Sequence, residues 1–377
     1  MTEIKTLIAG MALGIAGLPV WGAPGVTITI TNPLPQPRSE MVEIEASELP
    51  FTNGVLRDER GYEVPWQLTY DGKLIFPANV TPSGSAKYEF VEGVPSPVDT
   101  IACASFHPER VDDIAWENDF AAYRAYGPAF GATGGKAYGF DVWTKSNTRP
   151  VVVERYLNEL QRGKSYHIDH GDGMDVYDVG PSLGGGAAAP VGRDGHFIYP
   201  NSFSEWEIAD NGPLRTTLRL KFEYGGGEEV RVITLDAGNP LNRNTVVFNG
   251  FEADSIAAGI VVHKPFDKAY TLTDNYIAVV DPTQKPGSGN GVIFIGLVNP
   301  SKDATTRFVP LEKPVGQIVG HAVSLMPYVS GNPLTYYWGS CWNKGRIMTP
   351  DQWQSMLYDA SRRLLNPLVT TVEINDK

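Results

Sequence analysis

The chain has 377 residues, 42% of them hydrophobic and 20% charged, so it can bury a large core and is not a disordered protein. Its 43 acidic residues outnumber 31 basic ones and leave a net charge of −12, which argues against nucleic acid as a partner. Its 40 glycines and 29 prolines predict short strands joined by many turns, not a helical bundle.

The N-terminal segment is the first feature along the chain. An apolar stretch over residues 6–20, followed by the small residues Gly22 and Ala23, predicts a secretory signal peptide over residues 1–23. The glycines and the proline in this stretch argue against a stable membrane span. We therefore expect an exported protein, periplasmic or secreted, with one folded domain over residues 24–377.

Strand patterns dominate the rest of the chain. Apolar and polar residues alternate over Val26–Thr31, and they do so again over Thr217–Tyr224, where a glycine turn leads into the return strand Val230–Leu235. Further β-rich runs lie at residues 245–248, 259–262, 276–280 and 291–298. The predicted fold class is all-β and mainly antiparallel: one large β-sandwich with long loops.

A single helix is predicted near the C-terminus. Thr349 is a suitable N-cap, Pro350 fits the first helical position, and Gln352 completes a capping box. Apolar residues follow at helical spacing until Asn366. We expect this helix to pack on the outside of a sheet.

The two cysteines leave two interpretations open. An exported protein can pair Cys103 with Cys341, but both have apolar neighbours, and buried free thiols are equally compatible with the sequence.

An arginine flanked by aromatic residues is the first candidate for chemistry. In an extended segment Arg124 shares a face with Ala122 and Tyr126. Such an arginine can hold a carboxylate through two contacts while the ring supports a sugar face. The alternative is a surface ion pair with Glu117 or Asp119.

The most concentrated polar motif lies at residues 166–177. Imidazoles beside carboxylates suit proton transfer near neutral pH, which makes His167 and His170 candidate catalytic residues. If the motif binds a metal, its ligands are Asp169, Asp172 and Asp175, although the spacing matches no specific metal motif. No cofactor is required, and calcium is the possible cation. A solvated Asp/Gly loop is the remaining alternative.

Two further segments carry candidate binding residues. The glycine-rich run at residues 180–187 has no phosphate-binding signature and fits a loop or lid that approaches a ligand closely. A turn at residues 211–214 delivers Arg215 onto a strand, and the aromatic run at residues 336–342 can stack on sugars or fill a core.

The motifs together resemble an uncharacterised bacterial family, domain of unknown function 4861. The resemblance runs from about residue 26 to the C-terminus, and the motifs that carry it lie at residues 117–128, 139–145, 166–175, 180–185, 210–215, 235–238 and 336–339. It implies an exported protein of glycan-degrading bacteria that works on carbohydrate, with uronic-acid polymers as an expected substrate. The large antiparallel sandwich is also similar to the galactose-mutarotase-like superfold, which by itself does not define a function.

The leading hypothesis is a lyase that cleaves uronic-acid glycans by β-elimination. This chemistry needs a cation for the substrate carboxylate, a base for the α-proton, and an acid for the leaving oxygen. The expected cation is Arg124 or Arg215, and the expected base is His167 or His170. The candidate acids are Tyr126, Tyr177 and Tyr166, and further substrate contacts are expected from His196, Tyr337 and Trp338.

Three alternatives remain open from the sequence. A glycoside hydrolase would use two carboxylates drawn from Asp169, Asp172, Asp175 and Glu205. A mutarotase-like epimerase would pair a histidine with a carboxylate, and a non-catalytic glycan-binding protein would use the aromatic residues and calcium.

Overall fold

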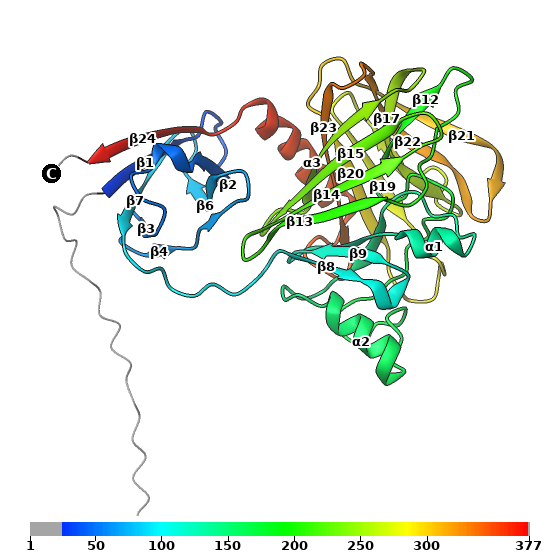
Figure 1. Ribbon diagram of the computed structural model, residues 1–377, viewed down its shortest axis with the longest axis horizontal. Helices are drawn as coiled ribbons and strands as arrows, with labels where there is room; N and C mark the ends of the chain where they lie inside the picture. The colour runs from blue at the N-terminus through cyan, green and yellow to red at the C-terminus, as the bar shows by residue number, and fades with distance from the viewer. Residues whose placement is uncertain (1–24, 376–377) are drawn as a thin grey trace, which may run out of the picture.

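The computed structural model describes residues 25–375 (Figure 1). The predicted signal peptide lies outside these residues. The named strands pair in antiparallel fashion throughout, and they stack into sandwiches, which confirms the predicted all-β class. None of the helices within residues 25–375 is long and apolar enough to cross a membrane.

The largest sheet has eight strands in the order β13-β14-β15-β16-β23-β20-β19-β18. Its strands are β13 (Glu205–Asn211), β14 (Arg215–Glu223), β15 (Glu228–Asp236), β16 (Leu241–Asn249), β18 (Tyr270–Leu272), β19 (Tyr276–Asp281), β20 (Ile293–Val298) and β23 (Pro333–Trp342). The predicted hairpin is confirmed, because β14 and β15 pair from Arg215 opposite Asp236 to Glu223 opposite Glu228.

Two four-stranded sheets complete the large body. One has the order β12-β17-β22-β21, with β12 (Ala188–Gly192), β17 (Ala253–His263), β21 (Thr305–Val315) and β22 (Ile318–Pro327). The other has the order β11-β10-β9-β8, with β8 (Cys103–His107), β9 (Asp113–Glu117), β10 (Ala121–Ala125) and β11 (Asp141–Thr144).

A smaller sandwich is formed by the N-terminal strands together with the last strand of the chain, and it lies apart from the large body in Figure 1. Its sheets are β24-β1-β7-β3-β4 and β2-β6-β5. The strands are β1 (Gly25–Thr31), β2 (Arg38–Glu45), β3 (Gly54–Asp58), β4 (Glu63–Val64), β5 (Gln67–Leu68), β6 (Lys73–Val80), β7 (Ser85–Glu92) and β24 (Val369–Asn375). This sandwich buries a core of its own, separate from the main core of the larger body.

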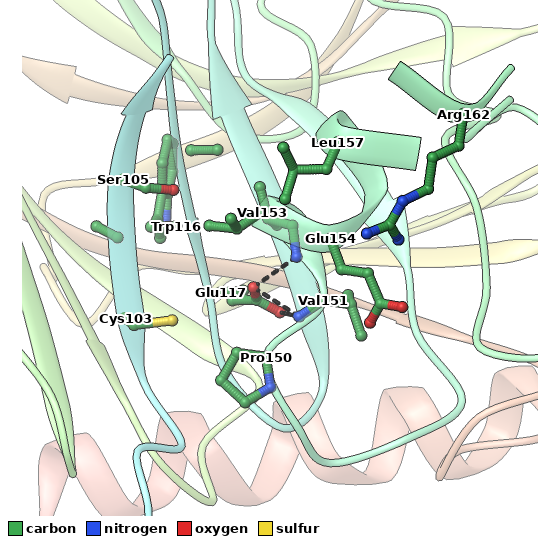
Figure 2. A pocket seen from close by; sticks show the side chains of 13 residues that line it. Cys103, Ser105, Trp116, Glu117, Pro150, Val151, Val153, Glu154, Leu157 and Arg162 are labelled. Atoms are coloured by element: carbon green, nitrogen blue, oxygen red, sulfur yellow. Dashed lines mark hydrogen bonds between the residues drawn. The ribbon is translucent and has the colours of Figure 1, made fainter. Parts of the chain in front are cut away.

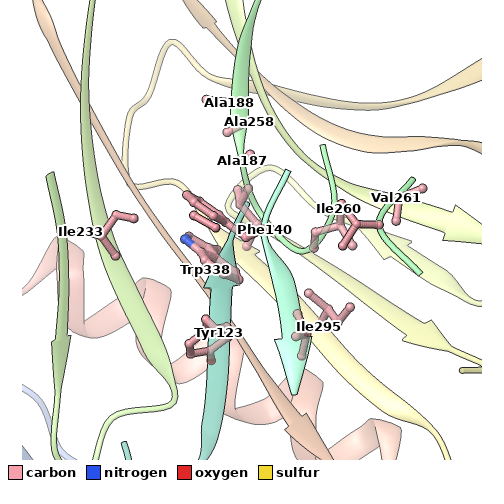
Figure 3. Packing of buried hydrophobic residues seen from close by; sticks show 14 of the residues in the cluster. Tyr123, Phe140, Ala187, Ala188, Ile233, Ala258, Ile260, Val261, Ile295 and Trp338 are labelled. Atoms are coloured by element: carbon pink, nitrogen blue, oxygen red, sulfur yellow. The ribbon is translucent and has the colours of Figure 1, made fainter. Parts of the chain in front are cut away.

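The main core is built around aromatic rings (Figure 3). The indole of Trp338 stacks on Phe140 with ring centroids 5.0 Å apart, and Tyr123 meets the same indole edge-on at 4.9 Å. The glycine-rich run packs here too, because a Cβ atom on Gly186 would lie 2.3 Å from the Trp338 ring. The run is therefore a buried packing element, and the expectation of a ligand loop or lid is wrong.

Three α-helices lie outside the sheets: α1 (Pro128–Ala132), α2 (Val152–Arg162) and α3 (Pro350–Leu365), with short 3₁₀ turns at Ala46–Glu48 and Pro108–Arg110. Helix α3 is the predicted one, and Thr349 and Gln352 form the expected capping box. Its residues Trp353 and Leu357 pack against the eight-stranded sheet, as predicted. Helix α2 was not predicted; it covers one face of the β8–β11 sheet (Figure 1).

Candidate functional site

The outer face of the β8–β11 sheet carries a set of charged side chains. Alternation along each strand puts Trp116 and Tyr123 on the main core and turns Asp113, Arg124 and Asp141 to the opposite face. Arg124 lies directly across from Asp141 in the register of β10 and β11. Helix α2 and the loop over residues 163–175 cover this face, so the charges are enclosed.

Arg124 is the centre of this group, which we call the Arg124 cluster: Arg124, Asp113, Asp141 and Asp175. Its Nη2 atom lies 2.5 Å from Asp141 Oδ2 and 3.1 Å from Asp175 Oδ2, and its Nη1 atom lies 3.6 Å from Asp113 Oδ2. The predicted surface pair with Glu117 or Asp119 is not formed. Instead, carboxylates of the chain itself occupy the place that we expected a substrate carboxylate to take.

Aromatic rings enclose the guanidinium, as the sequence suggested. Its central carbon lies 4.8 Å from the ring centre of Tyr126 and 5.2 Å from that of Trp143. The Tyr126 hydroxyl also accepts a hydrogen bond from Arg124 Nη2 at 3.2 Å. Tyr166 stacks on Trp143, and its hydroxyl accepts a bond from Arg110 Nε at 2.9 Å.

Burial changes the acidity of these groups. It raises the pKa of Asp113 to about 6 despite the nearby Arg124, and it raises the pKa of Asp175 well above its ordinary value, with help from the charge of Asp141. Burial likewise raises the pKa of the Tyr126 phenol, which therefore keeps its proton at neutral pH. Shifts of this kind in a compact group of acids and bases are typical of functional sites.

Several buried polar atoms of this region have no hydrogen-bond partner among residues 25–375. They include Nε and Nη1 of Arg124, Oδ1 of Asp175 and the hydroxyl of Tyr177. Buried groups without partners cost stability, and a fold retains them where they serve another purpose. The hydroxyl of Tyr177, one of the expected acids, is therefore buried without a hydrogen bond to the Arg124 cluster or to any other described group.

His167 is the histidine that meets this cluster. Its Nδ1 atom lies 2.9 Å from the backbone oxygen of Asp175 and 3.7 Å from the Asp175 carboxylate. Its side chain is 46% exposed, whereas Arg124 and Asp175 are almost fully buried. The imidazole therefore stands at the surface of the cluster with one nitrogen held by the protein.

His170 and two of the loop carboxylates have different surroundings. His170 Nε2 lies 2.9 Å from the backbone oxygen of Ser165, and Asp169 accepts bonds from the backbone N–H groups of Gly171 and Gly173. Asp172 faces Arg155 at 3.5 Å.

The three candidate metal ligands thus have separate partners. Within residues 25–375, no group of three or more histidine, cysteine or acidic side chains is arranged to hold a metal ion. That no cofactor is required, with calcium as the possible cation, stays a prediction for elemental analysis.

The other candidate residues lie elsewhere. Arg215 forms a two-point ion pair with Asp236, at 2.6 and 2.8 Å, and reaches Glu43 of the small sandwich at 2.7 Å, so it ties the two sandwiches together. Trp338 is a core residue. Tyr337 is half-buried beside the apolar residues that pack with Trp353 and Leu357 of α3, while His196 and Glu205 are exposed.

A cavity of about 560 Å³ lies at the start of α2, where the sequence suggested no site (Figure 2). Its lining is mostly apolar, and its most buried charged group is Glu117. That carboxylate is already occupied, because it accepts bonds from the N–H groups of Val151 and Val152 and from Lys145. Cys103 also lines it as a free thiol, and burial raises its pKa to about 12, which leaves it unreactive.

Asp113 offers a test of the electrostatics. A carboxyl whose pKa rises from 3.8 to about 6 on folding stabilises the fold below pH 4 and loses that contribution as the pH rises through 6. Asp113→Asn removes this titration. We expect the stability of the parent relative to the variant to fall by about 2–3 kcal/mol between pH 4 and pH 7. Urea unfolding of both proteins at four pH values measures this difference, and a constant difference would contradict it.

Comparison with known proteins adds a family and two structural likenesses. The family model described as domain of unknown function, DUF4861, matches residues 30–370. "Uncharacterized protein P7" of Formosa agariphila is 27% identical over 384 residues, spanning 92% of this chain and 93% of that protein.

Two solved structures are similar at 8% sequence identity. One is an α-mannosidase from Enterococcus faecalis V583, with a TM-score of 0.49 over 94% of this chain and 46% of that one. The other is a protein in glycosyl hydrolase family 38 from Enterococcus faecalis, with a TM-score of 0.47 over 93% and 47%. The chain spans less than half the length of either.

Proposed function

The chain belongs to the DUF4861 family, and from the chemistry of its site we propose that it is a carbohydrate-active enzyme that cleaves acidic glycans by β-elimination. The observation that carries this proposal is the setting of His167. A backbone oxygen can only accept a hydrogen bond, so the contact with Asp175 places the proton of a neutral imidazole on Nδ1. Nε2 then has a free electron pair, as a general base requires.

We assign the remaining roles to partly exposed groups that contact Arg124 or Tyr166. In the reaction, the base takes the proton α to the substrate carboxylate, the electron pair forms a carbon–carbon double bond, and the bond to the leaving oxygen breaks. Tyr126 is half-buried and keeps its proton, so it can supply the acid. Arg110, also half-buried, is the cation for the substrate carboxylate, because Arg124 is already paired.

The distances allow these groups to act on one substrate. Tyr126, Asp175 and His167 are linked by contacts of 3.2, 3.1 and 3.7 Å through Arg124 and the Asp175 carboxylate. Together these contacts limit the distance between the Tyr126 hydroxyl and His167 Nδ1 to 10.0 Å. The proposed base, Nε2, lies on the far side of the same ring, so these contacts place Tyr126 and His167 around one cluster but set the limit for Nδ1 only.

A glycoside hydrolase is the second candidate, favoured by one observation. Asp141 Oδ2 and Asp175 Oδ2 both contact Arg124 Nη2, at 2.5 and 3.1 Å, so they are at most 5.6 Å apart. That limit is compatible with a retaining hydrolase, and the raised pKa of Asp175 suits an acid. However, both carboxyl groups are at most 1% exposed, which keeps a sugar from touching them.

Incubation with a panel of uronic-acid, sulfated and neutral polysaccharides tests the proposal. We expect absorbance near ~235 nm from an unsaturated product to rise together with reducing ends, because elimination produces both. Reducing ends alone would show hydrolysis. Binding without either signal would show a glycan-binding protein. We expect no cofactor to be required; a parallel arm with a chelator, followed by elemental analysis, tests this and shows whether calcium is bound.

A further inference from the structure

A second cavity, of about 340 Å³, lies between α2 and the loop over residues 164–173, and we call it the loop cavity. Tyr166 and Ile168 line it, so it lies against the chain segment that carries His167. Three cations also line it: Arg149, Arg155 and Lys164.

The charge of this cavity is positive in an acidic protein. Its acidic lining residues are Glu154 and Asp172, so the three cations exceed the anions by one charge even when His170 is neutral. Arg149 pairs with Glu154 at 2.8 Å, whereas no ion pair within the described chain involves the exposed Lys164. The net charge of the whole chain is −12, which makes a cationic cavity a local exception.

Arg155 adds an independent observation. Its side chain is 5% exposed, and its Nη2 atom donates to the backbone oxygens of Thr144 and Asp172 at 2.9 and 2.8 Å. Its Nε and Nη1 atoms have no partner among residues 25–375, and neither does the buried Oδ1 atom of Asn147, which also lines the cavity. Arg155 and Asn147 thus line the cavity with incompletely satisfied polar groups, which makes this wall suited to a polar ligand.

We propose that the loop cavity binds the anionic group, a carboxylate or a sulfate ester, of a sugar residue that adjoins the reacting one. This inference rests on the proposed function, which supplies the acidic glycan as substrate. It adds the group of the substrate that the protein recognises. Guanidinium and ammonium groups bind such oxyanions through charge-assisted hydrogen bonds. The cavity thus gives the site its preference for acidic over neutral glycans.

Calorimetric titration tests the proposal without relying on turnover. The host protein is His167→Ala, so that no ligand is consumed, and the probes are a galacturonic acid trisaccharide, a sulfated galactose trisaccharide and neutral cellotriose. We expect Lys164→Glu and Arg149→Ala to weaken binding of an anionic trisaccharide roughly tenfold or more, the size of one charge-assisted bond. Added salt should weaken binding further. Whichever anionic probe binds more tightly identifies the group as carboxylate or sulfate.

Arg193→Ala is the matched control, because it removes an exposed arginine that pairs with Glu252 at 3.5 Å and does not line the cavity. Its affinity should stay within twofold of the host. Three results would overturn the proposal: unchanged affinity in both cavity variants, binding of cellotriose as tight as that of the anionic probes, or no binding of any probe. If binding depends on the cavity charges but the parent enzyme forms no cleavage product, the cavity proposal stands and the proposed function is refuted. If the parent cleaves acidic glycans but the cavity variants bind as tightly as the host, the proposed function stands and the cavity proposal is refuted.

Discussion

Replacing His167 with alanine is expected to lower the turnover of an acidic glycan by ~10²–10⁴-fold, the usual contribution of a general base. The variant should fold normally, because the imidazole is 46% exposed and makes few contacts. Production of the 235 nm chromophore by parent and variant measures the loss of turnover, and circular dichroism with thermal unfolding checks the fold.

His167→Asn is the matched variant for this test. Its amide nitrogen takes the place of Nδ1 and can donate to the Asp175 backbone oxygen as the imidazole does, but an amide cannot take up a proton near neutral pH. If His167 only positions the loop, asparagine should restore activity. If it is the base, asparagine should be as inactive as alanine. Activity of both variants within twofold of the parent would remove His167 from the mechanism.

The strand pattern predicted much of the fold because alternation reports directly on burial. Val26–Thr31 and the hairpin of β14 and β15 lie where the sequence put them. The same rule explains part of the site. It put Arg124 on one face with Ala122 and Tyr126, and in the structure Arg124 contacts the ring and the hydroxyl of Tyr126.

The alternation pattern could not predict which acidic residues pair with Arg124. Asp141 and Asp175 follow Arg124 by 17 and 51 residues, and only the strand register and the long loop bring them to it. The positions of Asp113 and Asp141 were detectable in principle, because each lies two residues before a buried residue, Ala115 or Trp143, on the same face of its strand. No local motif marks either aspartate as part of a site. His167 and His170 were predicted as equals, and only the fold of the loop separates their roles.

Helix α2 escaped prediction for a related reason. It begins with β-branched residues, and neither Val151 nor its near neighbours provides a side-chain cap. The cap comes from Glu117, whose carboxylate accepts the N–H bonds of Val151 and Val152 from 34 residues away. A helix whose first turn is satisfied by a distant strand leaves no start signal in its own sequence. The loop cavity was missed for the same reason, because α2 forms one of its walls.

The largest effect on stability is expected at Arg231, inside the main sandwich. Its side chain is 1% exposed, and it donates to both oxygens of the fully buried Glu229, at 2.6 and 3.0 Å. Its guanidinium also stacks on Phe140 and Phe222. Arg231→Met leaves the Glu229 charge buried without its partner, so we expect a loss of about 3–5 kcal/mol in the free energy of unfolding, measured by urea denaturation.

The double variant with Glu229→Met separates charge from packing. It removes the stranded carboxylate, so we expect it to be more stable than Arg231→Met, although Tyr224 loses the acceptor that it contacts at 2.8 Å. Arg219→Met, on the exposed face of the adjacent strand β14, is the control and should change stability far less. If the unpaired charge of Glu229 causes the loss, the double variant must be more stable than Arg231→Met. If it were no more stable than the single one, the effect of Arg231 would come from its packing between the two phenylalanine rings.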